Sequence, residues 1–183
     1  MTSDHQTVLH PEPSPFADRN AALAALAWQP ALPPGEGHLP LGDGIWLSLE
    51  PGRGASFRCD PAEEGGFRLA LHDAGRARWA SLSFDLPLGG LARGRYVGLR
   101  LRARSAKFFS YRPCLRYLPH EGQAVDRFTE DYIVSSGGLR EQLSHIPVDH
   151  DLLSRCRATE MHLFFQGADF ESDILALEAL LIL

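Results

Sequence analysis

Arginine side chains alternate with apolar side chains between residues 96 and 104, which predicts a strand with two chemically different faces. Arg100, Arg102 and Arg104 occupy one side of an extended chain, and Leu99 and Leu101 occupy the other. The wider stretch 86–120 contains no Asp or Glu but eight of the 18 basic residues. Because a guanidinium group donates two parallel hydrogen bonds to a carboxylate or phosphate, this strand could present an anion-binding face.

Polar and aromatic residues follow the same alternation on other predicted strands. Arg112 and Arg116 share one side of the next strand, and His162, Phe164 and Gln166 share one side of the penultimate strand. If these sides belong to one sheet, their guanidinium, imidazole, amide and ring groups suit sugar hydroxyls or a carboxylated or phosphorylated glycan. A tryptophan ring could also stack on a sugar. The candidate ligand-binding residues are Arg100, Arg102, Arg116, His162, Gln166 and Trp46.

A second interpretation of the arginines is structural. Arginines on a sheet pair with carboxylates of neighbouring strands, here Glu130, Glu160 or Glu178, and each pair contributes about 0.2–1 kcal/mol. The two interpretations differ in what surrounds each guanidinium, because paired arginines have carboxylate neighbours and ligand-binding arginines point into an open groove. We expect the other two tryptophans, Trp28 and Trp79, to be core or staple residues.

The sequence predicts no catalytic residues and no metal centre. It has no Gly-x-Ser-x-Gly motif, and its histidines and cysteines form no His-x-x-x-His or Cys-x-x-Cys pair. Glycoside hydrolysis needs two carboxylates roughly 5 to 9 Å apart. Adjacent residues on a strand point to opposite faces, so Glu130 and Asp131 are no such pair. Glu130 with Glu160, or Asp131 with Glu178, would need the fold to bring them together, and a glycan-active enzyme stays an alternative.

Charge and composition exclude several classes of partner. The chain carries −5 overall and +8 in residues 86–120, so the remainder carries −13, which argues against nucleic-acid binding. No apolar run approaches the length of a membrane span, and the first seven residues have no features of a secretory signal. Cys59, Cys114 and Cys156 are odd in number and lack metal-type spacing. We therefore expect reduced thiols in a cytoplasmic protein.

We expect residues 1–43 to form an irregular arm and residues 44–183 a β-sandwich domain. In the arm, Asn20 could cap a helix over Ala21–Trp28, and the prolines and glycines of Pro30–Asp43 predict a loop. Strands spaced by about eight to twelve residues, interrupted by one helical turn within 149–157, favour an all-β sandwich. The predicted strands are Ile45–Leu49, Ala55–Cys59, Phe67–His72, Ala77–Asp85, Tyr96–Arg104, Phe108–Leu118, Arg127–Val134, Glu141–Pro147, Glu160–Gln166 and Asp173–Leu183.

The last of these segments supports two assignments. Its residues are good helix formers, and Ser172 or Asp173 could cap a helix. Against a helix, Leu177, Ala179 and Leu181 belong to a period-2 apolar row, and a near-continuous apolar run suits a strand covered on both faces. We predict a strand.

The second half of the chain resembles the jelly-roll β-sandwiches of galactose-binding-like domains and carbohydrate-binding modules. The resemblance covers about 95–183 and is carried by Tyr96–Ser105, by Tyr111–Arg116, by Glu160–Gly167 and by the terminal apolar strand. It implies two antiparallel sheets and a ligand on one concave sheet or at the loop edge. The expected function is a non-catalytic module that binds a saccharide, including an anionic one, with a structural interaction domain as a further alternative.

The same resemblance implies a structural calcium ion, and no other cofactor is expected. Asp60, Glu63 and Glu64 could contribute oxygen ligands, but the sequence lacks a dense acidic loop, and we favour an exposed turn as the explanation of these residues. The identity of a protein partner and the oligomeric state stay open.

Overall fold

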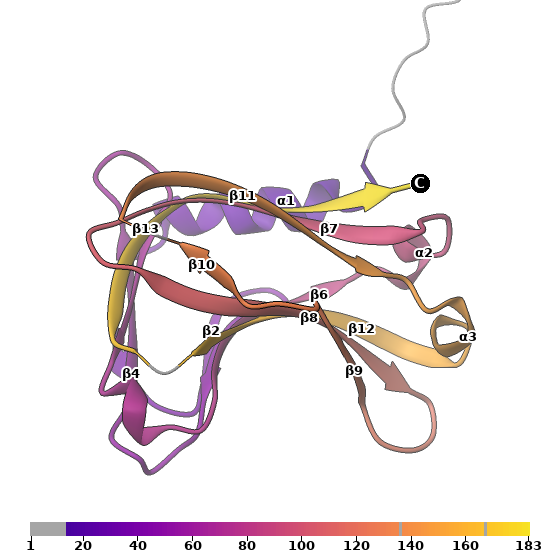
Figure 1. Cartoon of the computed structure of the whole chain (residues 1–183), viewed down its shortest axis with the longest axis horizontal. Helices are drawn as coiled ribbons and strands as arrows, with labels where there is room; N and C mark the ends of the chain where they lie inside the picture. The colour runs from indigo at the N-terminus through magenta and orange to yellow at the C-terminus, as the bar shows by residue number, and fades with distance from the viewer. Residues whose placement is uncertain (1–13, 136, 167) are drawn as a thin grey trace, which may run out of the picture.

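The computed structural model describes residues 14–135, 137–166 and 168–183 and confirms the predicted antiparallel β-sandwich (Figure 1). The first sheet contains, in spatial order, β1 (Leu32–Gly35), β4 (Ser56–Pro61), β5 (Phe67–His72), β13 (Phe170–Ile182), β7 (Tyr96–Ser105) and β11 (Gly138–Pro147). The second sheet contains β10 (Ile133–Ser135), β8 (Phe109–Pro119), β12 (Cys156–Gln166), β6 (Ala80–Leu86), β3 (Ile45–Leu49) and β2 (His38–Gly42). A further strand, β9 (Val125–Phe128), pairs with β8.

Short helices precede the first strand or connect later strands. They are α1 (Ala17–Ala25), η1 (Leu26–Trp28), η2 (Ala74–Arg76), α2 (Leu88–Leu91) and α3 (His150–Leu153). The last is the helical turn predicted within 149–157, and the Asp149 carboxylate caps it by accepting a hydrogen bond from the Leu152 amide at 3.0 Å. In the described residues, no helix is long and apolar enough to cross a membrane.

The core lies between the inner faces of the two sheets. Period-2 alternation turns Leu99 and Leu101 of β7 and Leu115 of β8 into this layer, where all three are buried. Aromatic rings join the sheets, since Phe109 of β8 stacks on Phe170 of β13 with ring centroids 4.8 Å apart. Cys59, Cys114 and Cys156 are buried free thiols, and burial raises the pKa of Cys114 to about 12.

The segment Pro30–Asp43, predicted as a loop, contains two strands instead. β1 is the edge strand of the first sheet and β2 the edge strand of the second. Prolines are tolerated at these positions because an edge strand has one side without ladder hydrogen bonds. Composition alone therefore misassigned a segment whose strands are held by tertiary pairing with β4 and β3.

The N-terminal helix begins earlier than predicted, and Asn20 is not its cap. The helix starts at Ala17, and the Asn20 amide contacts the backbone of Ala179 in β13. Its Nδ2 donates to the Ala179 carbonyl at 2.9 Å, and its Oδ1 accepts from the Ala179 amide at 2.8 Å. The Asn20 side chain thus occupies the hydrogen-bonding groups of β13 that a neighbouring strand would otherwise use.

The C-terminal segment is the strand predicted from its period-2 apolar row. β13 pairs with β7 along most of its length, but with β5 only from Phe170 to Ile174. A register shift between Ile174 and Ala176 marks the point where pairing with β5 ends. Beyond that point α1 lies alongside β13 (Figure 1), which explains why Asn20 reaches its backbone.

The predicted strand Arg127–Val134 is divided into two. β9 pairs with β8 as far as Cys114, and β10 pairs with β8 from Tyr111 onward. Between them, residues 129–132 leave the ladder opposite Arg112. The Arg112 side chain binds the carbonyls of Thr129 and Glu130 in place of a strand partner.

Candidate functional site

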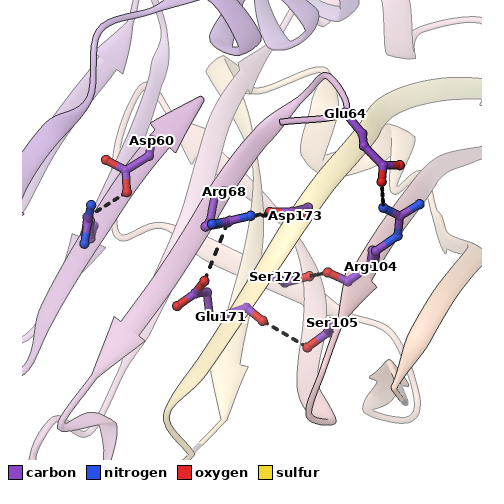
Figure 2. Close-up of polar contacts among 9 residues, drawn as sticks. Asp60, Glu64, Arg68, Arg104, Ser105, Glu171, Ser172 and Asp173 are labelled. Atoms are coloured by element: carbon purple, nitrogen blue, oxygen red, sulfur yellow. Dashed lines mark hydrogen bonds and ion pairs between the residues drawn. The ribbon is translucent and has the colours of Figure 1, made fainter. Parts of the chain in front are cut away.

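The arginine face of β7 is salt-bridged within the first sheet. Arg100 lies between Glu141 of β11 and Glu178 of β13, with nitrogen–oxygen distances of 2.9 and 3.1 Å. Figure 2 shows that Arg104 likewise contacts Glu64, at 2.5 Å, while Arg68 contacts Asp173, at 2.7 Å. The hydrogen bond from Arg104 lowers the pKa of the Glu64 carboxyl. These contacts agree with the second interpretation of the arginines, in which they pair with carboxylates of neighbouring strands. Glu178 was one of the carboxylates expected there.

The candidate residues do not form the single surface expected from their alternation. Arg100 and Arg102 lie on the outer face of the first sheet, whereas Arg116, His162 and Trp46 lie on the second sheet. The reason is the strand order, because β7 pairs with β13 and β11, while the next strand, β8, pairs with β12. Arg102 is exposed and lies opposite Glu141 in the ladder.

The outer face of the second sheet, here called the aromatic face, collects rings and polar groups from five adjacent strands and from β9. In the view of Figure 1 it is the underside of the lower layer, which contains β8 and β12. Register places Trp46, Ser83, His162, Cys114 and Phe128 in one row across the strands. Its members are His38, Trp46, Ser48, Ser81, Ser83, Asp85, Arg112, Cys114, Arg116, Asp126, Phe128, Glu160, His162, Phe164 and Gln166.

His162 is part of this face but is only 4% exposed. Its Nδ1 is 2.7 Å from the Ser83 hydroxyl, and its Nε2 is 2.9 Å from the Glu160 carboxylate. Phe164 stacks on the imidazole with centroids 5.4 Å apart, and Trp46 meets it edge-on at 6.1 Å. His162 therefore supports the rings of Trp46 and Phe164, and both of its ring nitrogens already have partners.

The Ser83–His162–Glu160 chain contains the residue types of a nucleophilic triad. The hydroxyl of Ser83 is fully buried and also lies 3.1 Å from the Ser81 hydroxyl. A nucleophile must reach a substrate carbonyl, so this chain serves as a buried polar network in the sheet.

Arg116 is also occupied by a partner on the aromatic face. Its Nε and Nη2 donate to the two carboxylate oxygens of Asp126 at 2.7 and 2.8 Å. This bidentate pair lowers the pKa of Asp126 and raises that of Arg116. Of the predicted candidates, Trp46, which is partly exposed, and Gln166, which is exposed, keep side chains available on this face.

The most accessible group of rings surrounds Arg112, which was not among the predicted ligand residues. The Arg112 guanidinium lies 5.0 Å from the centroid of Phe128 and 5.4 Å from that of Tyr132. Phe128 is 40% exposed, Tyr132 46% and Trp79 40%. With Phe164 and Gln166 they line a cavity of about 360 Å³. The outward parity of Arg112 with Arg116 was the one sequence signal that could have identified it.

The two tryptophans expected as core or staple residues both have exposed side chains. Trp79 lines the Arg112 cavity, and Trp28 is 87% exposed at the end of η1. The residue before Trp79 is anchored by the buried Glu50 carboxylate. This carboxylate accepts one hydrogen bond from the Arg78 backbone amide and one from the Arg78 side chain, each at 2.9 Å.

The residues that could have held calcium do not fit that ion. Asp60 contacts Arg58 at 2.6 Å and Glu64 contacts Arg104, so a guanidinium group lies where a cation would have to bind (Figure 2). Within the described ranges, no group of three or more His, Cys, Asp or Glu side chains is arranged to bind a metal ion.

Comparisons with known proteins agree with the architecture. No protein-family model and no curated protein sequence matches the chain. Among solved structures, a family 11 carbohydrate-binding module from Clostridium thermocellum, in complex with a β-1,3-1,4-mixed-linked tetrasaccharide, superposes with a TM-score of 0.53 and 11% identity. The match covers 81% of this chain and 97% of that one.

A second neighbour is a xylan-binding family 22 module of Xyn10C from Paenibacillus barcinonensis. It has a TM-score of 0.52 and 10% identity, with coverage of 80% of this chain and 89% of that one. At such low identity these likenesses concern the fold. The chain has the jelly-roll β-sandwich fold that carbohydrate-binding modules of these families adopt, as its resemblance predicted.

Proposed function

We propose that the protein is a non-catalytic carbohydrate-binding module that binds a saccharide on the aromatic face. The observation that carries the proposal is the set of accessible rings on one sheet face, from Trp46 of β3 to Phe128 of β9, with Phe164 between them. Aromatic rings bind the apolar faces of sugar rings while polar neighbours bind hydroxyl groups. The fold shared with known saccharide-binding modules supports this proposal.

The geometry favours a chain of sugars that runs across the strands. β3 and β9 are separated by β6, β12 and β8. Four inter-strand spacings of about 4.8 Å give a platform of roughly 19 Å. A ligand of this length would contact several strands at once, and an anionic saccharide remains within the proposal because Arg112 lies on the same face.

A glycan-active enzyme is less well supported on this face. Asp85 and Glu160 lie opposite each other on adjacent strands. Each has a partner, however, because Arg19 pairs with Asp85 and His162 contacts Glu160. The Asp131–Glu178 pair stays without support, because Glu178 lies on the first sheet beside Arg100, and the Glu130–Glu160 pair stays a prediction.

The proposal is tested with a glycan array, followed by calorimetry on the best saccharide. We expect Trp46→Ala and Phe128→Ala each to weaken binding by about tenfold, since each removes a ring of the aromatic face. Trp28→Ala, which removes an exposed ring at the end of η1, is the matched control and should bind like the wild type. Absence of saccharide binding would contradict the proposal and favour the interaction-domain alternative.

A further inference from the structure

Arg112 is held in one position by its own sheet, with part of its guanidinium left unused. Its Nε donates to the Thr129 carbonyl at 2.9 Å, and its Nη2 donates to the Glu130 carbonyl at 3.1 Å. A guanidinium has five N–H donors, so both N–H groups of Nη1 and one of Nη2 remain without a partner among the described residues. These donors form the outer end of the fork, the part that can bind a carboxylate through two parallel hydrogen bonds.

Arg112 also differs from Arg100, Arg104 and Arg116 in having no carboxylate partner among the described residues. In Arg100, Arg104 and Arg116, a guanidinium nitrogen lies within 3.1 Å of a carboxylate oxygen. The contacts described for Arg112 are to neutral carbonyls and ring faces. Its charge is therefore not neutralised by an ion pair in the described part of the chain.

The cavity beside Arg112 has the composition of an anion site. Two arginines, Arg112 and Arg78, contribute to its lining, and no Asp or Glu is among the described residues that line it. Glu50 neutralises Arg78, so Arg112 is the cation that remains available. Glu130 and Asp131 line a different cleft, which extends beside β11.

We propose that this cavity binds the carboxylate of a uronic acid residue, with its sugar ring against the neighbouring aromatic side chains. This inference rests on the proposed saccharide-binding function and specifies the class of sugar at one end of the platform. A planar carboxylate matches the free end of the Arg112 fork, and Gln166 can hydrogen-bond the hydroxyls beside it. Because the carbonyls already order the guanidinium, binding costs little side-chain entropy.

The test uses two ligands that differ only in the oxidation state of C6 in each of their four sugar residues. Cellotetraose and β-1,4-linked tetraglucuronate share the same backbone, with a hydroxymethyl group in the first and a carboxylate in the second. By calorimetry at low salt, we expect the wild type to bind tetraglucuronate about tenfold more tightly, the gain expected of one charge-assisted bidentate contact. That preference should shrink as salt is raised.

Three variants distinguish a specific contact of Arg112 from attraction by positive charge elsewhere on the protein surface. Arg112→Gln should abolish the preference, and Arg112→Lys should lose most of it, because an ammonium lacks the fork. Arg100→Gln removes an arginine from the opposite sheet and should keep the full preference. Thermal unfolding of each variant verifies the fold, and salt dependence of the wild type gives a measurement that needs no substitution.

Each outcome is decisive. Equal or tighter binding of cellotetraose overturns the uronate site and leaves saccharide binding intact. An equal loss of preference in Arg100→Gln overturns it as well, and so does a tighter complex with cellotetraose sulfate than with tetraglucuronate. Failure of both tetrasaccharides overturns the uronate site, and the glycan array then decides separately whether the protein binds saccharides at all.

Discussion

At the scale of single residues, Glu50 has the clearest effect on the site. It is buried, and its hydrogen bonds with Arg78 lower its pKa to about 2 and hold the chain next to Trp79. The ordinary pKa of Glu is about 4.3, so Glu50 contributes stability that is fully present above that value. This contribution is lost as the pH falls through about 2.

We predict that the wild type loses stability between about pH 5 and pH 2 more steeply than Glu50→Gln, since the glutamine cannot take up a proton. Urea unfolding at a series of pH values measures the difference. Glu121→Gln, at an exposed glutamate, is the control and should follow the wild type. Parallel pH curves for Glu50→Gln and the wild type would show that Glu50 is not responsible.

At the scale of elements, α1 replaces a strand along one edge of β13. The side-chain amide of Asn20 binds both backbone groups of Ala179, at a position beyond the pairing with β5. Without Asn20 a partly buried amide and carbonyl would have no partner, and such a loss costs about 1–3 kcal/mol. An open strand edge also promotes pairing with other chains.

Asn20→Ala should therefore lower the free energy of unfolding by about 1–3 kcal/mol and increase aggregation on heating. Denaturant unfolding and light scattering measure the two effects. Asp18→Asn, an exposed position of the same helix, should change stability by less than about 1 kcal/mol. Equal stability of Asn20→Ala and the wild type would mean that water satisfies the edge of β13.

At the scale of the whole molecule, stability depends mainly on the core between the two sheets and little on the ion pairs of the outer faces. Phe109→Ala removes a ring that stacks between the sheets and should cost about 3–5 kcal/mol. Arg100→Ala breaks partly exposed ion pairs and should cost far less, because solvent screens such pairs. Thermal and urea unfolding of both variants provide the comparison, and a larger loss for Arg100→Ala would contradict this division.

The sequence by itself determined most of the strands, because alternation with period 2 is a local property. It identified β3 and β5 with their observed ends, and the apolar row of β13 distinguished that strand from a helix. Edge strands rich in proline and the division between β9 and β10 depend on pairing with distant residues, which no local pattern reports.

Only the tertiary structure decided which faces belong together. Alternation shows that Arg100 and Arg116 each point outward from a strand, but strand order places them on opposite sheets. Likewise, the position of His162 in the alternating pattern could not reveal that Ser83 contacts its Nδ1 and Glu160 its Nε2. Among the described residues, Arg112 binds backbone carbonyls, and no carboxylate, because residues 129–132 leave the ladder opposite it. A site formed by contacts between distant segments depends on strand order, and strand order is set by the packing of the whole chain.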